Sequence, residues 1–222
     1  MPRFDTPAAL TARVDVPAGR LLFIAADRAD TVVEVRPADA ARSRDVKAAA
    51  EVEVACADGV LEVRAARGSR NRLLGDSGSV EITVQLPAGS HVEAKAEAAE
   101  FRGVGRLGDV VLDGGHRSVK LDEAASARLT AHDGPVVVRR LTGPGDLSTQ
   151  RGDVTVDEAT RGALTLSTQL GDITVGAARG VAAVLDAGTV VGRVDNTLRN
   201  DGTPVLTIRA TTTKGDITAR SL

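Results

Sequence analysis

The chain has 222 residues, a formal net charge of −2 at pH 7, and neither Trp nor Tyr. A charge this close to zero lacks the basic excess that nucleic-acid binding needs, so no nucleic-acid partner is expected. Three Phe are the only aromatic residues, so the stacking of sugars or bases on aromatic faces is nearly excluded.

Cys56 is the only cysteine, so no intrachain disulfide can form. The opening residues, MPRFDTPAALTARVDVP, lack the basic start and the apolar run of a secretory signal. No stretch approaches the roughly 20 apolar residues that a membrane helix needs. We therefore expect a cytoplasmic protein with a reduced thiol and no membrane partner.

Residues 1–100 read as strands without a regular spacing, and they predict a sandwich-like β cap. The expected strands lie at 10–16, 21–25, 31–36, 51–55, 60–65, 79–86 and 91–96. Residues 39–50 are rich in Ala and Arg, with Val46 as their only β-branched residue, and predict a short helix. The segment Gly68–Gly78 is polar and basic, which predicts a mobile loop.

Residues 101–222 carry a repeated phrase that predicts a stacked β structure. Gly152-Asp153-Val154-Thr155-Val156 and Gly171-Asp172-Ile173-Thr174-Val175 show its form most clearly: a glycine turn, then apolar, polar and apolar residues. Further phrases start at Gly108, Arg117, Ser126, Gly134, Gly145, Gly162, Gly180 and Gly188. Phrases lie roughly nine residues apart, and such regular spacing signals a repeat architecture.

We therefore predict an all-β fold, a β-solenoid or β-roll with about nine residues per half coil. Alternate phrases fall on two faces, and the regular spacing breaks after Gly188, so a C-terminal cap is expected from about residue 190. The second and fourth residues after each turn should face the core because side chains alternate along a strand. These residues are Val110, Leu112, Val119, Leu121, Val136, Val138, Val154, Val156, Leu164, Leu166, Ile173 and Val175.

These segments resemble a known family. The phrases GDVTV and GDITV, the stretch DTVVEVRP from Asp30, the segment GRVDNTL from Gly192 and the closing KGDITAR are similar to the bacterial β-strand-repeat "putative adhesin" family, domain-of-unknown-function family 4097, and in particular to its cytoplasmic actinobacterial branch. The resemblance covers nearly the whole chain. It implies a β-solenoid fold and supplies no catalytic residues.

The Gly-Asp turns hold the candidate ligand-binding residues, and two interpretations stay open. Asp153 and Asp172 should lie on one face in adjacent coils, where stacked carboxylates could bind a hard cation such as calcium. The calcium-binding nonapeptide rolls, however, need G-G-x-G-x-D, and this chain has only G-D. The favoured interpretation is that Asp109, Asp146, Asp153, Asp172 and Asp216 accept hydrogen bonds from turn backbone, so no metal is required.

No other motif predicts chemistry. His91, His116 and His132 lack metal-ligand spacing, and Cys56 has no evident base nearby. The chain contains no G-x-S-x-G and no phosphate-binding loop, so we expect no enzyme activity and no cofactor. The leading hypothesis is a non-enzymatic interaction or scaffold protein whose partner is a protein. The alternative is a ligand- or carbohydrate-binding solenoid, including a carbohydrate-active one.

Overall fold

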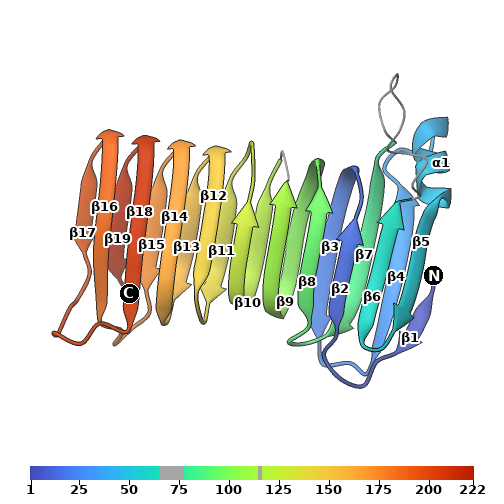
Figure 1. The fold of residues 1–222 in the computed structure, drawn as a ribbon, viewed down its shortest axis with the longest axis horizontal. Helices are drawn as coiled ribbons and strands as arrows, with labels where there is room; N and C mark the ends of the chain where they lie inside the picture. Colours follow the sequence, from blue (N-terminus) through green and yellow to red (C-terminus); the bar gives the residue numbers. More distant parts are fainter. Residues whose placement is uncertain (66–77, 115–116) are drawn as a thin grey trace. The chain divides into compact units, whose positions relative to one another are not determined.

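The computed structural model describes residues 1–65, 78–114 and 117–222. Within them the chain is mostly β-strand with one short helix, as the all-β prediction requires (Figure 1). The loop expected at Gly68–Gly78 lies outside the described residues except for Gly78, and so does His116. Over the described ranges, no helix is long and apolar enough to cross a bilayer.

The chain divides into two compact units, Met1–His116 and Arg117–Leu222, which we call the N-terminal and C-terminal units. The boundary expected at residue 100 falls instead inside β9, which runs without a break from Ala98 to Gly114. Because β9 pairs with β3 and then with β8, its residues belong to the N-terminal unit.

The N-terminal unit contains nine strands and the helix among its described residues. They are β1 (Arg3–Asp5), β2 (Thr11–Asp15), β3 (Ala18–Ala26), β4 (Asp30–Pro37), α1 (Ser43–Ala50), β5 (Val52–Ala57), β6 (Val60–Ala65), β7 (Val80–Pro87), β8 (His91–Ala96) and β9 (Ala98–Gly114).

Parallel pairing organises the N-terminal unit, in place of the irregular sandwich expected from its sequence. Strand β2 lies between β6 and β8, and strand β3 lies between β7 and β9, all in parallel pairs. Antiparallel strands complete the two ladders, because β5 pairs with β6, and β4 pairs with both β7 and β1. The core includes a stacked pair of rings, Phe23 and Phe101, whose centroids lie 5.2 Å apart.

The helix expected near residues 39–50 is present as α1, and it packs against β4 and β7. Its Asp45 is only 3% exposed, yet a carboxylate oxygen accepts a hydrogen bond from the Ser79 backbone amide at 2.9 Å. This bond satisfies a carboxylate that would otherwise be costly to bury, and it ties the helix to the residue before β7.

The C-terminal unit contains ten strands. They are β10 (Val119–Thr130), β11 (Val136–Leu141), β12 (Gly145–Arg151), β13 (Val154–Ala159), β14 (Gly162–Leu170), β15 (Ile173–Ala177), β16 (Ala183–Val191), β17 (Val194–Thr197), β18 (Leu206–Lys214) and β19 (Ile217–Ser221).

Two parallel ladders build this unit, and consecutive strands alternate between them. The first ladder runs from the start of β10 through β11, β13, β15 and β19 to β17. The second runs from the end of β10 through β12, β14 and β18 to β16. Val136 pairs with Val154 and Val154 with Ile173, so neighbouring coils lie 18 and 19 residues apart. The repeat length of about eighteen residues is confirmed.

The inward positions of the repeat are confirmed as core. All twelve predicted residues, from Val110 to Val175, are at most 2% exposed. The Thr residues between them point outward: Thr165 is exposed, and Thr155 and Thr174 are half-buried. The predicted strand register is therefore correct, since a shift by one residue would exchange the two sets.

The last coil of the C-terminal unit does not follow the sequence order. Strand β18 lies between β14 and β16, and β19 lies between β15 and β17, so β16 and β17 end the two ladders (Figure 1, at the left). The cap expected from about residue 190 therefore differs from the structure, in which residues 206–221 form an internal layer. Gly188 is also not a turn, because β16 continues through it and the turn comes at Gly192.

Candidate functional site

The Gly-Asp turns of the first ladder lie above one another at one corner of the C-terminal unit. We call this set the corner column; it consists of Gly152-Asp153, Gly171-Asp172, Gly215-Asp216 and Gly192-Arg193. Gly171 has a φ of 150°, and a Cβ built on it would lie 2.1 Å from the Gly152 carbonyl oxygen. Only glycine allows the coils to approach this closely at the corner.

Each carboxylate of the corner column accepts a hydrogen bond from the next coil. The Asp172 amide donates to Asp153 Oδ1 at 2.8 Å, and the Asp216 amide donates to Asp172 Oδ1 at 2.7 Å. The two cation candidates, Asp153 and Asp172, thus lie in adjacent coils as expected, and one oxygen of each holds a backbone amide. Across the described part of the chain, no group of three or more His, Cys, Asp or Glu could hold a metal ion.

Arg193 ends the corner column, at the position where the other turns carry Asp. Its backbone amide donates to Asp216 Oδ1 at 2.8 Å, and its guanidinium lies 3.5 Å from Asp216 Oδ2. Because β17 ends its ladder, no further coil would supply a backbone amide to the carboxylate of an Asp at this position. Arg193 instead places a positive charge beside the carboxylates of the column. The sequence signal was the change from Gly-Asp to Gly-Arg at Gly192.

A second set of residues at this corner was missed by the sequence analysis. The hydroxyls of Thr149, Thr168, Thr212 and Thr189 donate to the carbonyl oxygens of Gly134, Gly152, Gly171 and Gly215 at 3.3, 2.9, 3.1 and 3.0 Å. Thr149, Thr168 and Thr212 are each 5% exposed. We call this set the threonine ladder. Its signal is a Thr three residues before each corner glycine, as in Thr168-Gln169-Leu170-Gly171.

The remaining predicted site residues lie elsewhere. The Asp109 amide donates to His91 Nδ1 at 2.9 Å, so His91 serves there as the acceptor that Asp supplies in the corner column. His132 Nδ1 lies 3.3 Å from Gln150 Nε2 of the next coil. Asp146 is not in the corner column, because it points outward from β12 in register with Thr165. These histidines therefore take part in contacts between coils.

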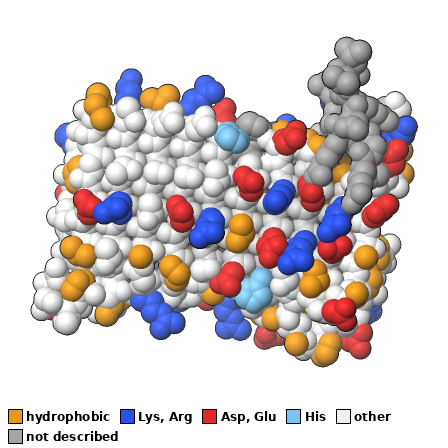
Figure 2. Space-filling view, viewed as in Figure 1, with side chains coloured by type: hydrophobic (Ala, Val, Ile, Leu, Met, Phe, Trp, Pro, Cys, Tyr) orange, Lys and Arg blue, Asp and Glu red, His pale blue; other side chains and the backbone are white. Residues whose placement is uncertain are grey.

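The outward side chains of the second ladder form regular polar rows, which we call the outward face. One row consists of Thr130, Ser148, Ser167 and Thr211, one from each successive strand. In the neighbouring row Arg209 Nε lies 3.1 Å from Asp186 Oδ2. Adjacent strands are about 4.8 Å apart, so the rows repeat at that spacing. Figure 2 shows this side of the C-terminal unit as mostly uncharged, with a few adjacent acidic and basic side chains.

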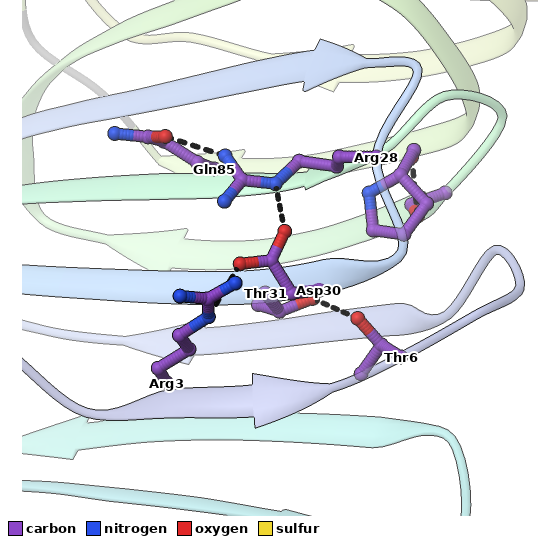
Figure 3. A network of polar contacts seen from close by, with 8 residues as sticks. Arg3, Thr6, Arg28, Asp30, Thr31 and Gln85 are labelled. Atoms are coloured by element: carbon purple, nitrogen blue, oxygen red, sulfur yellow. Dashed lines mark hydrogen bonds and ion pairs between the residues drawn. The ribbon is translucent and has the colours of Figure 1, made fainter.

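A polar network lies at the N-terminal strand (Figure 3). Asp30 forms ion pairs with two arginines. Arg28 Nε lies 2.8 Å from Asp30 Oδ1, and Arg3 Nε lies 2.8 Å from Asp30 Oδ2. Arg28 also donates to the Gln85 side chain, and the hydroxyls of Thr6 and Thr31 lie 2.8 Å apart. The pKa of Asp30 is lowered, chiefly by the hydrogen bond from Arg28. Partial burial acts in the opposite direction, and the positive charges of Arg28 and Arg3 lower the pKa further.

An open groove of about 500 Å³ lies beside this network, between residues 3–10 and the turn that joins β5 to β6. Phe4, Leu10 and Cys56 give it apolar lining, while Arg3, Asp5 and Asp58 give it charged lining. Burial raises the pKa of the Cys56 thiol. Because the thiolate is the nucleophile, a raised pKa makes Cys56 a poor one at neutral pH.

The fold resembles those of solved bacterial proteins described as adhesins. A "putative adhesin" from Bacteroides fragilis is 14% identical, with 100% of this chain and 95% of that chain covered and a TM-score of 0.46. A "putative adhesin" from Parabacteroides distasonis is 15% identical, with 98% and 95% covered and a TM-score of 0.48. A "putative cell adhesion protein" from Clostridium sporogenes is 11% identical, with 100% and 98% covered and a TM-score of 0.36. No protein-family model matches the chain, and no curated protein matches it. Identities this low say nothing about a shared partner.

Proposed function

We propose that the protein is a non-enzymatic β-solenoid scaffold that binds a partner protein through its outward face. The observation that carries this proposal is the register of the second ladder, in which Ser148, Ser167 and Thr211 stack in one row. Coils offset by 18 and 19 residues with alternating ladders support the solenoid description.

Rigidity makes such a face suitable for recognition. Buried side chains and hydrogen bonds between coils fix the backbone beneath it, so few outward groups must be ordered when a partner binds. Short hydroxyl side chains also lose little rotamer freedom on binding. A near-neutral chain without Trp or Tyr favours a protein over a nucleic acid or a stacked sugar as the partner.

Proximity labelling in the cells that make the protein tests this function. The double variant Ser167→Tyr, Thr211→Tyr places two bulky rings side by side on the outward face. The matched control is Thr174→Tyr, Thr218→Tyr, which alters an equally registered pair on the first ladder. Loss of specific labelled proteins in the first variant and their retention in the control are expected. An unchanged set of labelled proteins in both would show that the outward face is not the binding surface.

The groove beside Phe4 supports ligand binding as a second candidate function. Its volume of about 500 Å³ falls within the range of small-molecule sites, about 300–1,000 Å³. Phe4 offers an apolar surface, and Arg3, Asp5 and Asp58 offer hydrogen bonds to a polar ligand such as a sugar. Calorimetric titration with soluble oligosaccharides, comparing the wild type with Phe4→Ala, tests it. Heats that are absent, or equal in both proteins, would remove this candidate.

A further inference from the structure

The C-terminal unit ends in two strands that each have one ladder neighbour. Among the described strands β16 pairs only with β18, and β17 pairs only with β19. The Ala183 amide points away from β18 and donates to the Arg199 carbonyl at 2.9 Å. The direction of the backbone amide and carbonyl alternates with each residue along a strand. The amides and carbonyls of Leu185, Ala187 and Thr189 therefore point to the same open side as those of Ala183. The open edge therefore runs from Val184 to Val190.

The core is open at this end as well. Val194 occupies the same inward position as Ile217 and Ile173, but it is 46% exposed whereas both isoleucines are 0% exposed. Outside the core, Val184 is 38% exposed and Val190 is 79% exposed. Neither β16 nor β17 contains the Lys or Pro that commonly protects a free strand edge.

Gly188 lies in the middle of this edge strand, where a glycine is unusual. Glycine weakens the middle of a strand, and there it often marks the close approach of another backbone or ligand. Within this chain nothing requires it, because a Cβ built on Gly188 would have no atom within 4 Å and its φ is not positive. Gly188 is in register with the outward Thr211, so it leaves room on the outward face for a side chain of an incoming strand.

We propose that this edge binds a second copy of the same chain, with β16 pairing antiparallel to its two-fold mate about Ala187. In this register Asp186 lies opposite Gly188 of the other copy, so its carboxylate fits the space that glycine leaves. Val184 lies opposite Val190 of the other copy, which covers the most exposed valine of the edge. Leu185 lies opposite Thr189. The two Asp186 side chains lie diagonally across the two-fold axis, and each is paired with Arg209 of its own chain at 3.1 Å.

The backbone supports the same register. In this register Ala187 lies opposite Ala187 of the other copy, and Leu185 lies opposite Thr189. All of these residues present their amides and carbonyls to the open side, so each opposed pair can exchange two hydrogen bonds. Pairing stops at Ala183, where Arg199 already accepts the amide. A two-fold interface of this kind closes on itself and gives a dimer rather than a fibre. It forms whether or not the outward face binds another protein.

Sedimentation velocity of the full chain, with three variants, tests the dimer. We expect a concentration-dependent dimer for the wild type. Val190→Asp, which places an unpaired carboxylate opposite Val184 and diagonal to Asp186 of the other copy, should weaken dimerisation at least tenfold. Gly188→Val should weaken it similarly without lowering the thermal stability of the monomer, because valine suits a strand and meets nothing within the chain. Leu170→Asp is the control. Leu170 is 47% exposed, pairs with Lys214 and lies two strands from the edge. This variant should dimerise like the wild type.

Cysteine cross-linking tests the register. In a Cys56→Ser background, Ala187→Cys should form a disulfide dimer under mild oxidation, whereas the exposed Ala163→Cys on β14 should not. A wild type that stays monomeric at high concentration would overturn the proposal. Open-ended polymers would overturn it too, as would a dimer that survives both Val190→Asp and Gly188→Val, or equal cross-linking at both positions.

Discussion

The backbone amide of Asp172 donates a hydrogen bond to the carboxylate of Asp153 at 2.8 Å, across the boundary between two neighbouring coils. The same contact recurs from Asp216 to Asp172. Stacked carboxylates in water a few Å apart repel by about 1 kcal/mol. An amide donor to each charged oxygen contributes about 1.5–3 kcal/mol, which offsets that repulsion without a cation.

Removing the acceptor should therefore cost stability. Asp153→Ala is expected to lower the free energy of unfolding by about 1–2 kcal/mol because the Asp172 amide loses a charged acceptor. Asp153→Asn keeps an acceptor oxygen and should lose less. Urea denaturation of the two variants measures the difference. Equal losses would show that the charge, and not the acceptor oxygen, stabilises the turn, and no loss in Asp153→Ala would show that neither does.

Calcium should leave the melting temperature of the protein unchanged. The ion takes six to eight oxygen ligands at one point, and in the corner column Asp153 and Asp172 each use one oxygen on a backbone amide. Thermal melts in millimolar calcium and in chelator should coincide. A rise of several degrees with calcium, absent in Asp153→Asn, would establish a cation site along the column.

The threonine ladder should stabilise the corner through its hydroxyls. Thr168→Val keeps the shape but leaves the Gly152 carbonyl without its donor, and is expected to cost about 1–2 kcal/mol. Thr165→Val, on the same strand but exposed, should change stability by no more than about 0.5 kcal/mol. Chemical denaturation compares them, and a Thr165→Val loss as large as that of Thr168→Val would contradict a special role for the buried hydroxyl.

A charge placed at a core position should unfold the C-terminal unit. Val156 is 0% exposed, so Val156→Asp would bring an ion into a dry interior and cost more than about 4 kcal/mol. Its neighbour Thr155 points outward and is half-buried, and Thr155→Asp should stay folded. Circular dichroism and thermal melts separate the two results. A folded Val156→Asp protein would mean that the core at this coil is accessible to water.

Acid should weaken the attachment of β1 to β4. The pKa of Asp30 is lowered in the folded protein, first by the hydrogen bond from Arg28, so the unfolded chain binds the proton more readily. The stabilisation is therefore present above the ordinary Asp pKa of about 3.9, and it is lost as the pH falls through the lower folded value.

Asp30→Asn should make the fall in melting temperature below about pH 4 shallower, because it removes this proton linkage. Glu97→Gln, an exposed carboxylate of the same unit, is the control and should leave the profile unchanged. Equal profiles for the wild type and Asp30→Asn would show that the Arg28 and Arg3 contacts do not contribute to acid stability.

The sequence determined the repeat itself. Alternation of apolar and polar residues is a local property of a strand, so Val154, Val156, Leu164 and Leu166 could be placed inside from the pattern alone. The regular spacing of the phrases gave the coil length, and the short helix followed from composition. The Thr three residues before each corner glycine was present in the same repeats and could have been read from them.

Tertiary structure alone decided which strands became neighbours. Leu164 pairs with Ile208, and Leu21 pairs with Phe101, across long stretches of chain. Several strands of similar apolar pattern could compete for each of these positions, and the choice depends on loop closure and on packing between distant segments. For the same reason the pattern could not show that β18 and β19 insert between earlier coils, or that β16, with Gly188 at its centre, is left at the edge.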